Sequence, residues 1–205
     1  MTTFSGDHDL DWHRALPELR EPVIIAAFEG WNDAADAATS AARHLAERFD
    51  ATPLASIDPE RYFDFGTTRP LVHLDDDRRR SITWPNTEVL AARVPTADRD
   101  VVFVVGLEPQ LQWRRYCRQV LTIADALGAS SVITLGALLA DVPHTRPVDI
   151  YGATDDPVLM ERLDLSPSTY EGPTGIVGVL TTESAAAGRP TTTYWAAVRS
   201  YVPGA

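Results

Sequence analysis

The sequence predicts an α/β protein built on a mixed, mainly parallel sheet, with an antiparallel meander appended to it. Apolar runs at 22–28, 101–105 and 132–135 are too short for helices and rich in β-branched residues, as buried parallel strands require. Segments with helical spacing follow the first two runs, so strands and helices alternate. Three short extended runs separated by turn residues predict the meander, at 71–74, 81–84 and 88–94.

The first unit joins the strand at 22–28 to a helix that ends near Phe49. Asn32 or Asp33 is a suitable N-cap for this helix. Alanines dominate its inner face, which lets the helix lie close to a sheet. A strand at 52–57 is then expected to complete a β-α-β unit.

The second unit starts at 101–105 and continues into a helix with Pro109 in its first turn and Gly128 at its end. The strand at 132–135 follows and leads into a loop at 136–147. Beyond this loop the sequence predicts three more elements. They are a short helix at 157–163 capped by Asp156, a helix that opens at 170–173 and ends at Gly188 and Pro190, and a last strand at 191–198.

Length and composition favour a single domain. The chain has 205 residues, of which 44% are hydrophobic, enough for one sizeable core. Residues 1–20 are polar and acidic, so we expect a partly ordered arm there, followed by one α/β domain over 21–205. No window approaches the roughly 18 to 20 apolar residues of a membrane span, and the N-terminus lacks signal-peptide features. The sequence therefore predicts a cytoplasmic protein.

Charge and residue usage exclude several functional classes. The formal net charge of −11 argues against nucleic acids and anionic membranes as partners, because both are polyanions. All eighteen basic residues are arginine, which excludes Schiff-base catalysis, a pyridoxal-phosphate site and a phosphate-loop lysine. Cys117 is the single cysteine and falls in an apolar-periodic helix, so a packed thiol is expected. The histidines show no metal-ligand spacing and no dinucleotide fingerprint is present; we predict no metal and no cofactor.

Polar residues gather in three loops, at 29–33, 141–146 and 170–174. Each loop follows a buried strand or precedes a helix, so all three can meet at the carboxyl edge of the sheet, where α/β proteins place ligands. The acid/base candidates are Glu29, Asp141 and His144, with Glu29 and His144 as a pair, and none is assigned a catalytic role. The guanidinium of Arg146 can bind a carboxylate or phosphate through two hydrogen bonds, and the backbone amides after Gly172 can bind an anion at the helix N-terminus. The full set of ligand-binding candidates is Gly30, Trp31, Asn32, Asp33, Arg146, Glu171, Gly172 and Thr174.

Each of these residues also has a structural interpretation, and taken singly that interpretation is favoured. Asp33 suits a helix cap, Trp31 a packing anchor, and His144 a hydrogen-bonding surface residue. Gly172, Gly175 and Gly178 recur every third residue and expose backbone, so we expect another group to approach closely there.

Three motifs in a consistent order resemble the proteasome assembly chaperone 2 family, specifically its actinobacterial branch. They are EGWNDA (29–34), DVPHTRP (141–147) and YEGPTGIVGVL (170–180), and SIDPERYFDF (56–65) and ITWP (82–85) match as well. Several separated motifs are more specific than one short pattern. The resemblance implies a three-layer αβα fold similar to that of the nucleoside phosphorylases, and homo-oligomers with a trimer favoured. For archaeal and eukaryotic relatives it implies assembly of 20S proteasome α-subunits.

Two features depart from the family pattern. Ala35 stands where the pattern usually has glycine, which is expected to stiffen the entry to the helix. Family members usually continue into a helical C-terminal region, which is expected to be absent here. Related chaperones dock onto the proteasome through a hydrophobic residue and a tyrosine near the C-terminus, which Pro203, Gly204 and Ala205 do not supply.

The leading interpretation is an assembly-chaperone-like protein that binds its own copies and proteasome subunits and has no established reaction. The alternative is a small-ligand-binding protein, or a hydrolase- or phosphorylase-like enzyme, that uses the cleft of the three loops. The implied fold hosts glycosidic-bond chemistry elsewhere, although fold analogy is a weak basis for a function.

Overall fold

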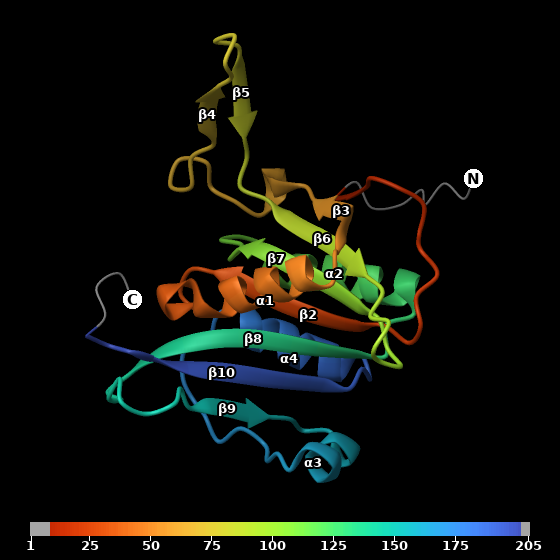
Figure 1. Cartoon of the computed structure of the whole chain (residues 1–205), viewed down its shortest axis with the longest axis vertical. Helices are drawn as coiled ribbons and strands as arrows, with labels where there is room; N and C mark the ends of the chain where they lie inside the picture. Colours follow the sequence, from red (N-terminus) through yellow and green to blue (C-terminus); the bar gives the residue numbers. More distant parts are fainter. Residues whose placement is uncertain (1–8, 202–205) are drawn as a thin grey trace.

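The computed structural model describes residues 9–201, and its body is an eight-stranded sheet (Figure 1). In chain order the strands of this sheet are β1 (Leu10–Trp12), β2 (Val23–Glu29), β3 (Thr52–Ile57), β6 (Thr87–Ala92), β7 (Val101–Leu107), β8 (Ser131–Ala140), β9 (Ile150–Ala153) and β10 (Thr191–Arg199). Their order across the sheet is β1-β3-β6-β7-β2-β8-β10-β9. The four strands β7, β2, β8 and β10 are parallel neighbours, and the outer strands join in antiparallel ladders. The predicted mixed, mainly parallel sheet is confirmed.

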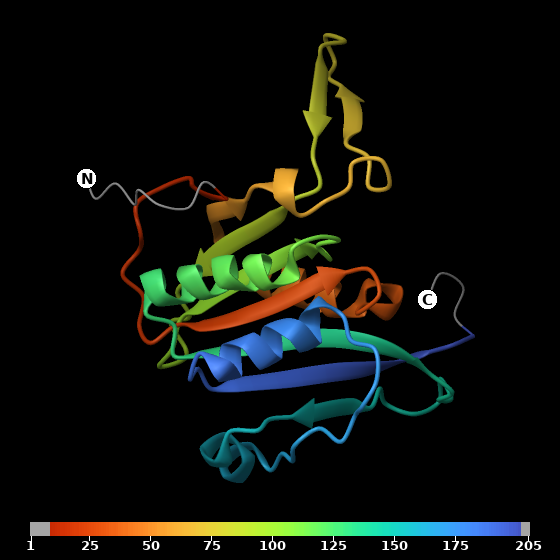
Figure 2. The same cartoon turned by 180° about the vertical axis from the view of Figure 1, so that it is seen from behind.

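Helices cover both faces of this sheet and give the expected three layers (Figures 1 and 2). On one face lies α1 (Ala37–Arg48), whose alanines pack against Ala27 of β2 and Phe103 of β7, as its small inner face predicts. On the other face lie α2 (Trp113–Leu127) and α4 (Ile176–Ala186), which cover Phe28. The short helices are η1 (Ala34–Asp36), η2 (Pro59–Arg61) and α3 (Pro157–Leu163), the last capped by Asp156 as expected.

The expected meander is confirmed in its first two runs only. The strands β4 (Leu71–Leu74) and β5 (Arg80–Thr83) form a separate antiparallel hairpin. The third run is β6, which enters the main sheet between β3 and β7. Because β6 and β7 lie between them, β3 runs in the same direction as β2 but is not its neighbour.

Three other boundaries differ from the sequence prediction. Strand β8 extends to Ala140 because β10 pairs along its whole length, so 136–140 is strand and not loop. Helix α2 starts at Trp113 and not near Pro109, because the carbonyl of Tyr62 binds the amides of Gln110 and Leu111. Helix α4 starts at Ile176 and not at 173, for a reason given with the site below.

The N-terminal segment is attached to the edge of the sheet. β1 pairs with β3, and Trp12, Leu16 and Leu19 pack against the core. The buried carboxylate of Asp9 binds the hydroxyl of Tyr62 at 2.8 Å. Burial acts to raise the pKa of Asp9, but hydrogen bonds from Arg115 and Tyr62 outweigh it, so that the pKa lies below its usual value. The expectations for residues 1–8 and for Pro203, Gly204 and Ala205 lie outside the described residues.

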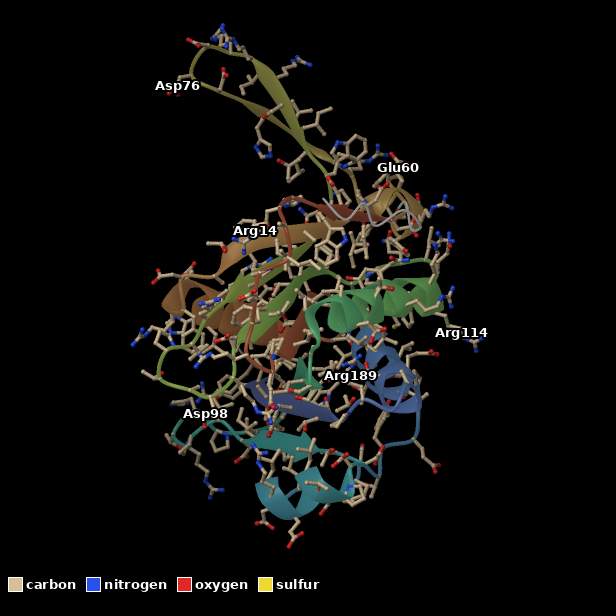
Figure 3. The ribbon with its side chains drawn as sticks, turned by 90° about the vertical axis from the view of Figure 1, so that its right-hand side faces the viewer. Arg14, Glu60, Asp76, Asp98, Arg114 and Arg189 are labelled. Carbon is tan, nitrogen blue, oxygen red and sulfur yellow. The ribbon has the colours of Figure 1, made fainter. Side chains whose placement is uncertain are left out.

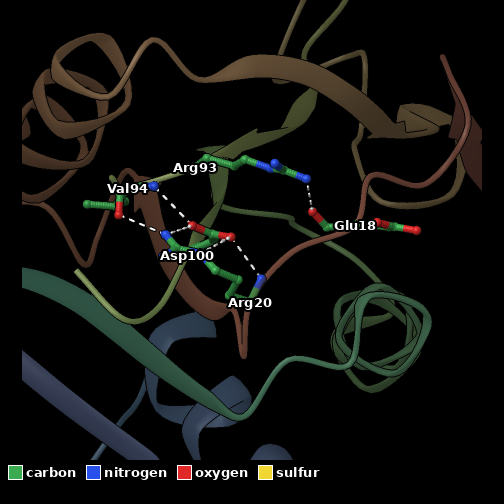
Figure 4. A network of polar contacts seen from close by, with 5 residues as sticks. All are labelled: Glu18, Arg20, Arg93, Val94 and Asp100. Carbon is green, nitrogen blue, oxygen red and sulfur yellow. Dashed lines mark hydrogen bonds and ion pairs between the residues drawn. The ribbon is translucent and has the colours of Figure 1, made fainter. Parts of the chain in front are cut away.

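An ion pair between the half-exposed Arg20 and the buried Asp100 ties the amino ends of β2 and β7 together (Figure 4). The fully buried Asp100 accepts hydrogen bonds from the side chain of Arg20 at 2.7 Å and from the backbone amide of Val94 at 3.0 Å. The hydrogen bond from Arg20 lowers the pKa of Asp100 to about 2, against the opposing effect of burial. This pair fixes the entry of the chain into two central strands.

Candidate functional site

The first and third of the predicted loops meet at the carboxyl edge of the sheet through Glu108, directly after β7. Oε1 of Glu108 accepts a hydrogen bond from Nδ2 of Asn32 at 2.6 Å and from the backbone amide of Ile176 at 2.9 Å. A carboxylate is stabilised at a helix N-terminus by the free amides and the helix dipole. The anion position at the start of α4 is therefore filled by the protein's own side chain. This contact also explains why α4 begins at Ile176.

Gly175 makes this arrangement possible because it leaves room for two side chains. A Cβ on Gly175 would lie 2.2 Å from Oδ1 of Asn32 and 2.7 Å from Oε1 of Glu108. Asn32 is fully buried, and its Oδ1 has no hydrogen-bond partner among residues 9–201. The predicted close approach to the glycine series is confirmed, and the approaching groups belong to this chain: Asn32 and Glu108 at Gly175, and Tyr170 at Gly172.

Asp33 has the structural role that the sequence favoured. One of its carboxylate oxygens accepts the amide of Ala38 at 2.6 Å, and the other accepts the amide and hydroxyl of Thr39 at 3.0 and 2.5 Å. Both oxygens therefore stabilise the start of α1. Between the cap and the helix, Ala35 has φ 54° and ψ 33°, the left-handed conformation that favours glycine. This conformation gives a physical reason for glycine in the family pattern at this position.

Glu29 lies on the α1 face of the sheet, where its carboxylate pairs with Arg43 at 2.6 Å. The two side chains line a pocket of about 310 Å³ at the base of the β4–β5 hairpin, together with Arg69, Trp84 and Glu88. Gly106 lies in its floor, where a Cβ would come within 2.3 Å of the carbonyl oxygen of Asn86. Neither His144 nor Gly172 lines this pocket.

The second loop, 141–146, makes its contacts with the end of β10. Nδ1 of His144 lies 3.1 Å from the hydroxyl of Tyr201, and Arg199 donates to the carbonyls of His144 and Arg146, at 3.4 Å each. The side chains of Asp141, His144 and Arg146 are exposed. Within residues 9–201, none of the hydrogen bonds or ion pairs of His144 reaches Glu29. The three loops share one edge of the sheet, but these contacts join only the first to the third.

The remaining candidates lie on the surface of this edge. Trp31 is 64% exposed, so its expected role as a packing anchor is wrong. Tyr170 is 66% exposed and its hydroxyl donates to the carbonyl of Pro173, while Glu171 and Gly172 are exposed beside it. Thr174 donates weakly to the carbonyl of Gly175, at 3.4 Å. Gly30 has φ 119°, which lets the chain turn after β2 close to Glu108.

Outside this edge, one further side chain and two features of the described residues bear on chemistry. The thiol of Cys117 is buried in α2 and burial raises its pKa to about 12, so it is a packed thiol as predicted. Among the described residues, no three side chains of His, Cys, Asp or Glu form a group that could hold a metal ion. No helix in that part of the chain is long and apolar enough to cross a membrane.

These features define a three-layer α/β protein with a mixed sheet and a polar carboxyl edge. The family model described as PAC2 family matches residues 27–205, so the chain belongs to the PAC2 family. A search of curated proteins finds no match.

Two solved structures from actinobacteria are 46% identical to this chain and share its fold. A PAC2 family protein from Streptomyces avermitilis has a TM-score of 0.82, with 88% of this chain and 77% of that chain covered. A proteasome-assembly chaperone homologue from Mycobacterium tuberculosis has a TM-score of 0.80, with 88% and 76% covered. An archaeal proteasome activator from Pyrococcus furiosus shares the fold at 15% identity, with a TM-score of 0.72 and 95% and 82% covered.

Proposed function

We propose that this chain is an assembly-chaperone-like protein that acts in the cytoplasm by binding its own copies and a proteasome subunit. The observation that carries the proposal is membership of the PAC2 family, with a 46% identical relative described as a proteasome-assembly chaperone homologue. No reaction is assigned to the chain.

The carboxyl edge supports a binding role. The carboxylates of Asp33 and Glu108 are engaged by the chain's own amides, and that of Glu29 pairs with Arg43. The exposed groups beside them are the aromatic side chains of Trp31 and Tyr170. Aromatic side chains on a rigid, hydrogen-bonded framework are typical anchors of protein interfaces. We therefore assign this edge as the surface that contacts the proteasome subunit.

The test is a direct binding measurement between the full chain and actinobacterial proteasome α-subunits, followed by native mass spectrometry. We expect a defined complex, and we expect Trp31→Ala to weaken it by about tenfold or more without lowering the melting temperature. Leu163→Ala is the matched control, because Leu163 is an exposed apolar residue (39%) of α3, which follows the antiparallel strand β9 and so lies at the opposite edge of the sheet. Absence of any complex with free or assembled α-subunits would refute the proposal.

The pocket beside Glu29 favours the second candidate, a small-ligand-binding or hydrolase-like protein. It combines an ion pair, the exposed Arg69 and the indole of Trp84 in about 310 Å³. Such a combination can bind an anionic ligand with an apolar part. A thermal-shift screen with nucleosides and small carboxylates tests it: a shift lost in Glu29→Ala, but kept in variants of Asp141 and His144, would place the ligand in this pocket.

A further inference from the structure

The β4–β5 hairpin projects from the body of the molecule (Figures 1 and 2), and Figure 3 places Asp76 at its tip. Every residue of both strands is exposed. An isolated two-stranded hairpin is only marginally stable in water and needs a surface to pack against. The hairpin therefore has the properties of an element that is completed by another molecule.

One face of the hairpin is apolar. Val72 pairs with Ile82 and Leu74 pairs with Arg80, so these side chains share a face, because side chains alternate along each strand. Val72, Leu74 and Ile82 are 57%, 61% and 54% exposed, so the chain itself leaves them uncovered. This apolar face, bordered by Arg80, is the surface to be covered.

Charge identifies the kind of partner. Residues 69–84 contain four arginines and three aspartates, a formal charge of +1, which leaves −12 on the rest of the chain. Arg78, Arg79 and Arg80 form no ion pair with any residue from 9 to 201. A complementary surface therefore offers carboxylates to these unpaired arginines and exposes apolar side chains to the hairpin face.

Such a surface lies at the other end of this same chain, on β9 and α3, and we call it the seat. Ile150 and Tyr151 are adjacent on β9, so they point to opposite faces of the sheet and flank its outer edge, and Val158 lies on α3; the three are 59%, 52% and 69% exposed. The exposed carboxylates around them are Asp149, Asp155, Glu161 and Asp164. β9 is an outer strand that pairs with β10 on one side. On its other side Ala153 forms a bridge with Ser166, and no further strand pairing is made there by 150–152 within the described residues. An open strand edge is prone to pair with another chain unless it is covered.

We propose that the β4–β5 hairpin of one copy packs on the seat of a second copy. The hairpin and the seat lie at opposite ends of the longest axis of the molecule (Figure 1), so a chain does not cover its own seat. Each copy donates a hairpin and accepts another, which is a heterologous contact; such a contact forms a ring where the rotation between copies closes and a filament where it does not. This inference rests on the homo-oligomeric part of the proposed function and adds the surfaces that form the contact.

The test uses light scattering with size-exclusion chromatography on the full chain and on two double variants. Arg78→Glu with Arg80→Glu reverses charge on the hairpin, and Asp155→Arg with Glu161→Arg reverses it on the seat. The wild type is expected to be oligomeric and each double variant monomeric. An equimolar mixture of the two variants is also informative. The charges now match between the reversed hairpin of one variant and the reversed seat of the other, and between the two unchanged surfaces. The mixture is therefore expected to form mixed complexes in which the two variants alternate, and which neither variant forms alone.

The matched control for the seat variant is Glu18→Arg with Glu47→Arg, which makes the same charge change on exposed residues outside both surfaces and should keep the wild-type mass. A second measurement does not depend on charge reversal: copies with Val72→Cys are mixed with copies carrying Val158→Cys under oxidising conditions. A disulfide between copies is expected, because Cys117 is buried and does not compete.

A monomeric wild type would overturn the proposal, and so would a seat variant that remains oligomeric while the hairpin variant dissociates. That second result would mean that a different surface or a different protein covers the hairpin. Binding of proteasome α-subunits is measured on the same variants. Oligomers without subunit binding refute only the proteasome part of the proposed function. Subunit binding by a monomeric wild type refutes this inference and the homo-oligomeric part, and leaves the proteasome part standing. An oligomeric wild type whose two double variants both remain oligomeric refutes only this inference.

Discussion

The central strand β2 and the peripheral β4–β5 hairpin are both rich in apolar residues but lie in opposite surroundings. Phe28 of β2 is fully buried, and its ring centroid lies 5.8 Å from that of Tyr116. Ile82 of β5 is 54% exposed. β2 has a parallel neighbour on each side and helices on both faces, whereas β4 and β5 pair only with each other in the described chain.

The difference shows that apolar content does not by itself decide burial. A strand is buried by the neighbours that the topology supplies, and the hairpin has none within the chain. We therefore expect the stability of the folded chain to depend on the core, and the hairpin residues to contribute mainly to association between copies. Three pairs of substitutions test this division.

The largest contrast is expected between Phe28→Ala and Ile82→Ala. Removing the Phe28 ring leaves a cavity in the core and should lower the free energy of unfolding by about 4 kcal/mol. Ile82→Ala should change it by less than about 0.5 kcal/mol, because the side chain is exposed in the single chain. Urea unfolding followed by circular dichroism, at a dilution where copies are dissociated, measures both. Similar losses for the two variants would show that the hairpin belongs to the cooperative core.

A smaller contrast is expected between the buried Asp100 and the exposed Asp76 at the hairpin tip. The pKa of Asp100 is lowered from 3.8 to about 2 in the folded chain, so its ionised form stabilises the fold by about 2 kcal/mol. This stabilisation is fully present above about pH 4 and is lost as the pH falls from there through about 2. Asp100→Asn should remove this contribution to the free energy of unfolding near neutral pH. In acid, the free energies of unfolding of the variant and the wild type should differ less. Asp76→Asn should match the wild type throughout, and an Asp100→Asn effect that does not depend on pH would contradict this account.

The sequence predicts well those elements whose pattern depends on local chemistry. The strands beginning at Val23 and Val101 are apolar because they are covered on both faces, and Asp33 and Asp156 are short polar side chains that cap the helices after them. The position of β6 between β3 and β7 depends on pairing between distant segments. No local pattern encodes that choice, so the sequence predicts a strand but not its neighbours.

The same limit explains the difference between the predicted and observed site. Glu29 was a candidate because it ends a buried strand, and Glu108 follows β7 in the same way, so a signal for it was present. Its partners Asn32 and Ile176 are 76 and 68 residues away in the chain, and only the fold brings them together. Trp31 was expected to pack, because an indole in a short loop next to a strand gives no indication of which side of the loop it occupies.

The smallest expected effect concerns backbone conformation at Ala35, compared with Arg78 in the hairpin turn. Both residues have left-handed conformations, with φ 54° and 60°. The left-handed conformation costs an alanine more free energy than the extra backbone entropy that a glycine loses on folding. Ala35→Gly should therefore raise the free energy of unfolding by about 0.5 kcal/mol. Ala37→Gly, at a helical position two residues on, should lower it by a similar amount. Arg78→Gly should leave the melting temperature unchanged, because the hairpin opens separately from the core. Calorimetry of the three variants decides: a lower melting temperature for Ala35→Gly would mean that the alanine conformation carries no strain.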